Sequence, residues 1–354
     1  MNINFPVQHY FAYITALEAE RVMREFTQSL TAPAIVPELI FQNPVDPEVE
    51  LSILLPVWNP DFKQFERCLK SLAAQDFGGI KYEIIVSDNA SDTDVVRRAL
   101  SQVGLEHARY HRHETNIGGF PNFNWCITAS RGKWLHILSH DDWIEQGFYA
   151  ALLRGEAERT ESDLRICRTR IVDETNGATN LMQDLSPTPQ IIPDFLERES
   201  TSQHIQFVGA LFSRRAAQTI GGFDPKLGAG ADWEYWTRLS SRFSVFYHPG
   251  SLANYALHQA SWSNREGGYE DVESFRKFRR ILVRILAHVP ESRRYAIATG
   301  FVRNMLSRLI GIAMRNRKAN VSSATRVVFE AFLVGCSEGG FLTDIEKILQ
   351  STPV

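Results

Sequence analysis

The run Leu51–Pro56 reads LSILLP and is apolar at nearly every position. A short continuous apolar run of this kind is typical of a parallel β-strand that is covered on both faces. The next segment, Phe62–Ala74, carries apolar side chains at three- and four-residue spacing, which predicts an amphipathic helix. A second apolar run follows at Tyr82–Val86, and a second helix is expected at Asp94–Val103. The pattern therefore predicts alternating strands and helices.

The alternation continues along the chain. We expect a strand near Ala108–His111, a helix at Pro121–Ala129 and a further strand at Lys133–Leu138. Alternation with such short links is typical of an α/β fold that has a mostly parallel central sheet with flanking helices. Because such sheets bind ligands outside the carboxyl ends of their strands, candidate site residues should directly follow each strand.

Composition excludes several classes of protein. The chain has 354 residues, of which 44% are hydrophobic and 22% are charged, so disordered, collagen-like and disulfide-scaffold proteins are excluded. The four cysteines lie far apart without a CxxC pair, which favours reduced thiols in the cytoplasm. The start of the chain lacks a signal peptide, and no stretch reaches the roughly 18 apolar residues that a membrane span needs. We therefore expect a soluble cytoplasmic protein, with a position at the inner face of the membrane as an alternative.

Polar and acidic residues follow the predicted strands. They are Trp58 and Asn59 after the first strand, Ser87–Asp92 in and after the second, and Ser139–Asp142 after the later one. Carboxylates that gather at one edge repel each other unless a cation or a hydrogen-bond donor lies among them. Oxygen ligands suit Mg²⁺ or Mn²⁺, and these ions in turn suit a diphosphate. No GxGxxG follows the first strand and no GxxxxGK[ST] occurs, which argues against dinucleotide and P-loop sites.

These segments resemble the motifs of the inverting family 2 glycosyltransferases with the GT-A fold. Leu51–Asn59 is similar to their opening strand and P-x-[YW]-N turn, and Val86–Thr93 to their V-x-D-[ND]-x-S-x-D stretch. Glu114–Gly119, with Asn122 and Asn124 after it, is similar to their E-x-N-x-G loop and the following helix. Leu138–Asp142 resembles their acidic metal motif.

Three further matches follow downstream in the same order. Ile220–Asp224 resembles the family's G-G-F-D/E segment on the acceptor side, and Ala231–Glu234 its E-D-x-[ED] catalytic stretch. Tyr255–His258, with the two serines after it, resembles the closing Y-R-x-H-x-x-S-x-S motif. The resemblance covers residues 49–265. It implies that the protein transfers a sugar from a nucleotide-diphosphate sugar to a hydroxyl of a saccharide or lipid-linked acceptor, with UDP as the commonest carrier. Such a reaction belongs to surface polysaccharide or glycan biosynthesis.

The resemblance also implies which residues bind the donor. These are Pro56, Trp58, Asn59, Asp88, Asn89, Asn116, Gly118 and Asp142. Pro56 and Trp58 would flank the base, and Asp88 would bond the base or the ribose. Structural alternatives remain open for each: Pro56 as a strand terminator, Trp58 as a packing residue, and Asp88 as a cap of the next helix.

The metal ligands implied by the resemblance are Asp141 and His258, and the ion would be Mn²⁺ or Mg²⁺. Ser139 and His140 replace acids of the usual D-x-D-D pattern. Asp142 would hold the sugar or support Asp141, or alternatively cap a helix at Trp143–Tyr149.

Asp232 is the implied catalytic base, because inverting transfer needs a carboxylate that takes the proton of the acceptor hydroxyl. Ala231 stands where the family has Glu. Glu234 is the rival base, but in a helix it lies roughly 200° around the axis from Asp232, so only one of the two can face a pocket. The departures at Ser139 and Ala231 keep a second hypothesis open, a catalytically weak glycan- or nucleotide-binding module.

We expect three regions: an N-terminal helical extension at 1–48, a GT-A glycosyltransferase domain at 49–268, and a basic α-helical region at 269–354. Between residues 270 and 326 there are thirteen Arg and Lys against four acids, whereas the whole chain has a net charge of −3. The basic region could be a helical cap that pairs with the acidic domain, a peripheral membrane contact, or a nucleic-acid surface. We expect no nucleic acid partner, and the cap could also form a homodimer.

Overall fold

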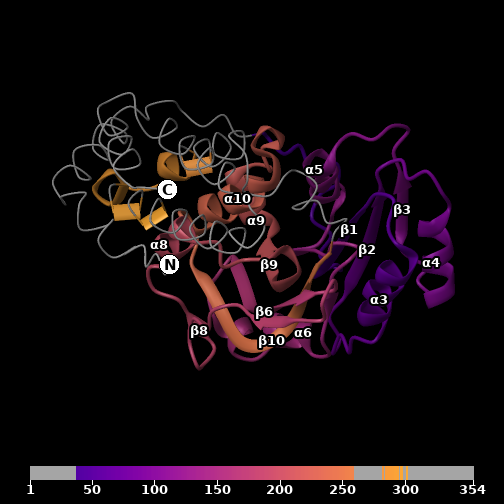
Figure 1. The fold of residues 1–354 in the computed structure, drawn as a ribbon, viewed down its shortest axis with the longest axis horizontal. Helices are drawn as coiled ribbons and strands as arrows, with labels where there is room; N and C mark the ends of the chain where they lie inside the picture. Colours follow the sequence, from indigo (N-terminus) through magenta and orange to yellow (C-terminus); the bar gives the residue numbers. More distant parts are fainter. Residues whose placement is uncertain (1–36, 259–280, 283, 295, 298–299, 302–354) are drawn as a thin grey trace, which may run out of the picture. The chain divides into compact units, whose positions relative to one another are not determined.

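The computed structural model describes residues 37–258 and, apart from residues 283, 295, 298 and 299, residues 281–301 (Figure 1). The chain divides into two compact units, the larger of which runs from Ile35 to Glu266. This larger unit is an α/β domain and contains every predicted site residue. The described residues beyond 280 belong to the other unit.

One mixed sheet forms the centre of the α/β domain. Its strands follow the order β3-β2-β1-β4-β9-β6-β10-β5. They are β1 (Leu51–Val57), β2 (Tyr82–Asp88), β3 (Arg109–Arg112), β4 (Trp134–Ile137), β5 (Trp143–Ile144), β6 (Leu164–Asp173), β9 (Ala210–Ser213) and β10 (Val245–Leu257). The first four strands along the chain are mutually parallel, whereas β9 is antiparallel to both β4 and β6. Two short strands, β7 (Thr179–Leu181) and β8 (Gln190–Ile191), pair with β6 and β10.

Helices cover both faces of the sheet. One buried cluster joins the strands to α3 (Phe62–Ala73), α4 (Val95–Val103) and α6 (Phe148–Leu153). The other joins them to α5 (Gly119–Ala129), α8 (Phe195–Thr201), α9 (Arg214–Ile220) and α10 (Ala231–Ser240). The remaining short helices are α7 (Glu156–Arg159), η1 (Phe207–Gly209) and η2 (Pro225–Gly230). The fold therefore has three layers, with the sheet between two sets of helices.

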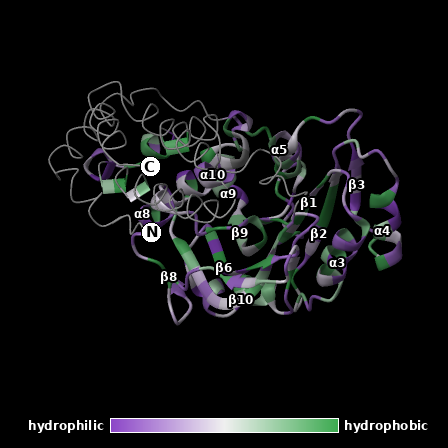
Figure 2. Cartoon of the chain, in the orientation of Figure 1, coloured by the Kyte–Doolittle hydropathy of each residue, from purple (hydrophilic) through white to green (hydrophobic). Residues whose placement is uncertain are grey.

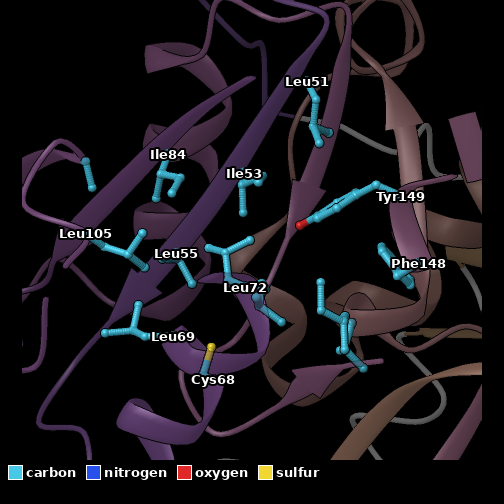
Figure 3. Close-up of a cluster of buried hydrophobic side chains, with 14 of the residues drawn as sticks. Leu51, Ile53, Leu55, Cys68, Leu69, Leu72, Ile84, Leu105, Phe148 and Tyr149 are labelled. Carbon is cyan, nitrogen blue, oxygen red and sulfur yellow. The ribbon is translucent and has the colours of Figure 1, made fainter. Parts of the chain in front are cut away.

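Alternation along β1 explains why its apolar run is continuous. Leu51, Ile53 and Leu55 pack toward α3 and α6, whereas Leu54 belongs to the cluster on the opposite face. Figure 3 shows Leu51, Ile53 and Leu55 in one cluster with Leu72 and Tyr149. Because successive strand residues point to opposite faces, a strand with helices on both sides needs apolar residues at every position. In the hydropathy colouring of Figure 2, β1 and β2 are largely green, whereas the helices beside them carry both green and purple residues.

The structure confirms the predicted α/β fold class, with element boundaries shifted by one or two residues. The predicted helix at Trp143–Tyr149 is wrong, because Trp143–Ile144 form strand β5 and α6 starts only at Phe148. Gly147 precedes α6 with a left-handed backbone, so Asp142 is not its N-cap. Strand β5 instead pairs with β10, which lies 100 residues further along and could not be read from the local pattern.

Residues 37–48 contain no helix and lie along the α/β domain. The amide of Gln42 donates to the Thr128 carbonyl at 2.9 Å, and the amide of Gly222 donates to the Pro37 carbonyl at 2.7 Å. The guanidinium of Arg214 lies 4.1 Å over the ring of Phe41. This segment therefore contacts α5 and α9. Residues 1–36 of the predicted N-terminal helical extension lie outside the described residues.

In the other unit, residues 284–288 and 291–294 are helical. Ile281, Leu282 and Ile285 are buried. Most of the predicted α-helical region at 269–354 lies outside the described residues. Among the described residues, no helix combines the length and the apolar character needed to cross a bilayer.

Candidate active site

Parallel pairing brings the carboxyl ends of β1, β2 and β4 to one edge of the sheet. Val57 pairs with Asp88 in β2, and Leu54 pairs with Ile137 in β4. The residues that follow these strands therefore start from neighbouring positions. This edge is where the fold is expected to bind a ligand.

Pro56 lies inside β1 rather than after it, because the strand continues to Val57. Strand β4 ends opposite Leu54, so β1 is paired only with β2 at Pro56. A residue without an amide hydrogen is tolerated where the ladder on one side has stopped. Pro56 is buried, whereas the Trp58 side chain keeps 40% of its surface exposed. An indole exposed beside the strand ends is available to a ligand ring.

Asn59 joins the loops that follow β1 and β2. Its backbone has a φ of 42°, in the left-handed region that Asn tolerates better than most residues. Its amide donates to the Ser91 hydroxyl at 2.9 Å, and its Nδ2 donates to Asp92 at 2.6 Å. The Asp92 amide returns a bond to Asn59 Oδ1 at 2.7 Å. Asn59 therefore shapes this edge of the sheet through its contacts with the second loop.

Asp88 is fully buried at the end of β2. The Ser91 amide donates to its Oδ1 at 2.9 Å, and the Tyr110 hydroxyl donates to its Oδ2 at 2.7 Å. Helix α4 begins four residues after Ser91, so Asp88 holds the turn before the helix and does not cap it. Each carboxylate oxygen can accept more than one hydrogen bond, so Asp88 can still accept from a ligand N–H or O–H.

Asn89 fixes the loop that contains Asn116 and Gly118. Its Nδ2 donates to Asn116 Oδ1 at 2.9 Å and to the Gly118 carbonyl at 3.2 Å. The amide of Ile117 donates back to Asn89 Oδ1 at 2.8 Å. Gly118 has a φ of 94°, a conformation that strongly favours glycine. The structure thus brings three predicted donor-site residues together through direct hydrogen bonds.

Asp141 and His258 meet although 117 residues separate them in sequence. His258 Nε2 lies 3.0 Å from Asp141 Oδ2. Burial opposes ionisation of Asp141, but the charge of His140 and the hydrogen bond from His258 outweigh burial, so the pKa of Asp141 is lowered. Asp141 is therefore held as a carboxylate beside an imidazole.

Asp142 faces the protein interior instead. It is buried, and the Ala256 amide donates to its Oδ1 at 2.8 Å. Burial and then the negative charge of Asp141 raise the pKa of Asp142 well above its ordinary value. Asp142 therefore ties the loop after β4 to β10 through its bond with Ala256.

Asp141 and His258 could bind a divalent cation only if the substrate supplies further ligands. Within the described part of the chain, no group of three or more His, Cys, Asp or Glu side chains is arranged to hold a metal. Asp141 and His258 supply one carboxylate oxygen and one imidazole nitrogen. Mg²⁺ is commonly bound by one or two protein carboxylates together with substrate phosphates, so the pair fits an ion that arrives with a diphosphate.

Asp232 is the second residue of α10 and keeps part of its surface exposed. The Trp233 amide donates to its Oδ1 at 2.7 Å, and Gln203 Nε2 donates to its Oδ2 at 2.7 Å. Burial of the carboxyl group raises its pKa to about 6. At neutral pH it is therefore mainly ionised, yet close enough to neutrality to act as an efficient proton acceptor.

Glu234 lies on a different side of α10 from Asp232. It is 1% exposed and pairs with Arg238, whose Nε lies 2.9 Å from Glu234 Oε1. Arg238 also donates to the Gly222 carbonyl at 2.8 Å. Glu234 is thus engaged in a buried ion pair, and Asp232 is the acid of this stretch that keeps access to solvent.

The segment Ile220–Asp224 is held by α5. Asn124 Nδ2 donates to the Phe223 carbonyl at 2.9 Å, and the Phe223 amide donates to Asn124 Oδ1 at 2.8 Å. A Cβ atom at Gly222 would lie 2.7 Å from Asn124 Oδ1, so only glycine fits there. The rings of Phe207 and Phe223 are 5.5 Å apart and pack in the buried cluster on this face of the sheet.

Three side chains at the site were missed by the sequence reasoning: Tyr110, which bonds Asp88; Gln203, which bonds Asp232; and Arg67. The Arg67 guanidinium donates to the Asp141 carbonyl at 2.7 Å and stacks 3.9 Å from the Trp143 ring. A local signal existed only for Tyr110, which lies in the strand next to Asp88. Arg67 and Gln203 reach their partners from elements far away in sequence.

Comparison with known proteins agrees with this geometry. Residues 52–221 match the family described as Glycosyl transferase family 2. The chain is 25% identical over 232 residues to MT1568 of Mycobacterium tuberculosis (strain CDC 1551 / Oshkosh), covering 62% of this chain and 70% of that protein. It is 30% identical over 148 residues to EpsH of Bacillus subtilis (strain 168), covering 40% of each protein.

Solved structures show the same fold at low sequence identity. S. aureus TarS 1–349 matches with a TM-score of 0.58 and 16% identity, covering 81% of this chain and 80% of that chain. The same protein in complex with UDP-GlcNAc gives a TM-score of 0.60 at 17% identity, covering 81% and 79%. The fold is therefore of the GT-A type. Residues 52–221 belong to the family 2 glycosyltransferases, and the protein is a glycosyltransferase.

Proposed function

We propose that the protein transfers a sugar, with inversion, from a nucleoside-diphosphate sugar to a hydroxyl of a saccharide or lipid-linked acceptor. The observation that carries the proposal is Asp232, a partly exposed carboxylate with a pKa of about 6 in the segment that matches the family's catalytic stretch. In the proposed step, Asp232 takes the proton of the acceptor hydroxyl. The hydroxyl oxygen bonds to the anomeric carbon while the bond to the diphosphate breaks on the opposite face.

The donor base would lie between the residues after β1 and those after β2. Trp58 is exposed beside this edge, and the Asp88 carboxylate already accepts from Tyr110 and Ser91. A carboxylate accepts hydrogen bonds, so it would pair with the imide N–H of uracil and not with the unprotonated ring nitrogen of cytosine. S. aureus TarS, which shares the fold, has been solved in complex with UDP-GlcNAc, and this supports a UDP-sugar as the donor.

Asp141 and His258 would hold Mn²⁺ or Mg²⁺ in this proposal. Such an ion supplies positive charge that stabilises the diphosphate as it leaves. The lowered pKa of Asp141 keeps its carboxylate ionised at neutral pH, as a ligand to a divalent cation must be. Asp142, which is buried and accepts from the Ala256 amide, would support the loop and not bind the ion directly.

The proposal is tested by measuring release of the nucleoside diphosphate from a panel of nucleotide sugars with Mn²⁺ and acceptor mixtures. Asp232→Asn should abolish transfer while leaving donor binding intact. Glu234→Gln is the matched control, because it changes the other acid of the same helix. Transfer that survives in Asp232→Asn but is lost in Glu234→Gln would reverse the assignment of the base.

A second candidate function is a catalytically weak glycan- or nucleotide-binding module. Ala231 favours it, because this fully buried methyl group stands where the family supplies a carboxylate. A module of this kind would bind nucleoside diphosphates with Mn²⁺ in a thermal-shift screen. It would show no turnover with any donor, and Asp232→Asn would then change nothing.

The acceptor and the cellular location belong to the proposal as well. A lipid-linked acceptor would suit a cytoplasmic enzyme that contacts the inner face of the membrane through the basic residues 270–326. Flotation with anionic liposomes at low and high salt, with and without residues 270–354, tests this contact. Flotation that changes neither with salt nor with removal of residues 270–354 would contradict the membrane contact. A homodimer of the full chain that persists at high salt would favour a helical cap instead.

A further inference from the structure

A turn between α8 and η1 brings an amide side chain to the proposed base. Gln203 Nε2 donates to Asp232 Oδ2 at 2.7 Å and lies 3.3 Å from the Ile205 carbonyl. The opposite oxygen of Asp232 accepts from the Trp233 amide at 2.7 Å. Two donors from different elements therefore fix both oxygens of the carboxylate, so the plane of the group is determined.

Glu199 at the end of α8 anchors this turn. Its Oε2 accepts from the His204 amide at 2.7 Å, and its carbonyl accepts from the Trp233 indole nitrogen at 2.5 Å. The His204 ring bonds the Ser202 carbonyl with its Nδ1 and lies 3.3 Å from Gln183 Oε1 with its Nε2. Gln203 lies between Ser202 and His204, both of which are held by these hydrogen bonds. The turn therefore fixes the position from which the Gln203 side chain reaches α10.

Glu199 also bears on the charge of Asp232. It is fully buried, and its Oε1 has no hydrogen-bond partner among the described residues. Burial, and to a lesser extent the charge of Asp232, raises the pKa of Glu199 well above its ordinary value. The raised pKa favours the neutral form of Glu199, which weakens its repulsion of a charged Asp232.

Other charged groups stand on the elements packed against α10, which are α8, α9 and η2. Arg215 pairs with Asp163, Arg214 donates to backbone carbonyls of Ser130 and Asn43, and Arg238 pairs with Glu234 in α10 itself. The remaining charged residues of these elements and the adjoining turns are Glu197, Arg198, His204, Asp224 and Lys226. The direct side-chain hydrogen bond that Asp232 receives comes from Gln203.

We propose that Gln203 is a positioning residue that orients the Asp232 carboxylate for the acceptor hydroxyl and stabilises its ionised form. The proposal rests on the role of Asp232 as the base. A hydrogen bond donated to a carboxylate favours the charged state, and a neutral amide donates at every pH in the working range. Gln203 thus partly offsets the effect of burial, which raises the pKa of Asp232.

The test is the pH profile of kcat/KM for the full chain with its donor and acceptor. The wild type should lose activity as the pH falls through about 6, where Asp232 becomes protonated. In Gln203→Ala this acid limb should move up by about one pH unit, because a hydrogen bond to the charged form is lost. In Gln203→Lys it should move down, because a cation favours the carboxylate. A merely structural role would lower activity equally at all pH values.

Two controls keep the result interpretable. Gln183→Ala removes a side chain that contacts the same turn through His204 but does not touch Asp232, so its acid limb should stay in place. A second readout needs no activity: the difference in unfolding free energy between each protein and its Asp232→Asn counterpart, followed against pH, bends at the pKa of Asp232. That bend should move in the same direction as the kinetic limb.

Failure of this inference and failure of the proposed function are distinguishable. If Asp232→Asn is inactive but the limb and the bend are unchanged in both Gln203 variants, Asp232 remains the base and the role of Gln203 is refuted. If Asp232→Asn is fully active, Asp232 is not the base and both assignments fall. Opposite shifts in Gln203→Ala and Gln203→Lys, with an unmoved limb in Gln183→Ala, support the inference.

Discussion

The two halves of the α/β domain build their parts of the site in different ways. In the first half, β1 to β4 are parallel, and the predicted site residues lie in the last positions of a strand or in the loop after it. In the second half, β9 runs antiparallel to its neighbours, and Asp232 opens a helix whose surroundings come from a distant turn. Local motifs place the predicted donor-site residues, whereas the environment of the proposed base depends on packing between α8 and α10.

The largest effect should follow from a change in the second half that leaves the fold intact. Asp232→Asn keeps the size of the side chain but removes the proton acceptor, so kcat should fall by about 10²–10⁴-fold. The measurement is release of the nucleoside diphosphate under saturating donor and acceptor. Donor affinity and the thermal midpoint should stay close to those of the wild type. A tenfold or smaller loss would contradict the role of Asp232.

The neighbouring acid should show the opposite pattern. Glu234→Ala leaves the Arg238 guanidinium buried without its carboxylate partner, and we expect unfolding free energy to fall by about 3–5 kcal/mol. Chemical denaturation measures this loss, with Asp232→Asn as the control from the same helix. A stable Glu234→Ala variant with strongly reduced kcat would mean that the two acids have been assigned the wrong way round.

In the first half, the hydrogen bonds of Asn89 can be removed without touching the proposed base. Asn89→Ala deletes three bonds between its side chain and the loop at Asn116–Gly118. Because the site is buried, unfolding free energy should fall by about 1–3 kcal/mol, and donor affinity should fall as well. Calorimetric titration with the donor measures the second effect. Unchanged donor affinity would contradict the view that this loop belongs to the donor site.

A smaller effect should come from Tyr110→Phe, which removes one donor to Asp88 and keeps the ring. Donor binding should weaken by about tenfold or less, because the lost bond orients Asp88 without being a contact to the donor, and the Ser91 amide remains. Isothermal titration with UDP and Mn²⁺ is the measurement. Asp88→Asn should weaken binding more than Tyr110→Phe, and the reverse order would contradict a direct contact between Asp88 and the base or ribose.

Asp232 should also make the stability of the protein depend on pH. The pKa of Asp232 is raised in the folded protein to about 6, whereas an unfolded Asp has about 3.9. The folded state therefore holds this proton more tightly between these two values, and the contribution of Asp232 to stability declines as the pH rises from about 4 to about 6. Asp232→Asn should lack this decline, which denaturation at pH 4.5 and pH 7 would detect. A parallel decline in both proteins would contradict the raised pKa.

The first half of the fold could be predicted because its signals are local. Continuous apolar runs, helical spacing and polar residues after each strand are all read within a dozen residues, and the structure keeps these elements with shifts of one or two positions. The strand at Trp143–Ile144 could not be predicted, because it exists only by pairing with Asn254 and Ala253 in β10. A two-residue strand carries no periodicity of its own.

The candidate site divides in the same way. The order of the motifs, the residue types at the strand ends and the placement of Asp232 and Glu234 on different faces of one helix could all be read from the sequence. The folded structure was needed to show that Asp141 meets His258, that Asp142 turns inward to Ala256, and that Gln203 reaches Asp232. The reason is physical: hydrogen bonds and desolvation depend on which groups folding brings within a few ångströms of each other, and residues distant along the chain supply those groups.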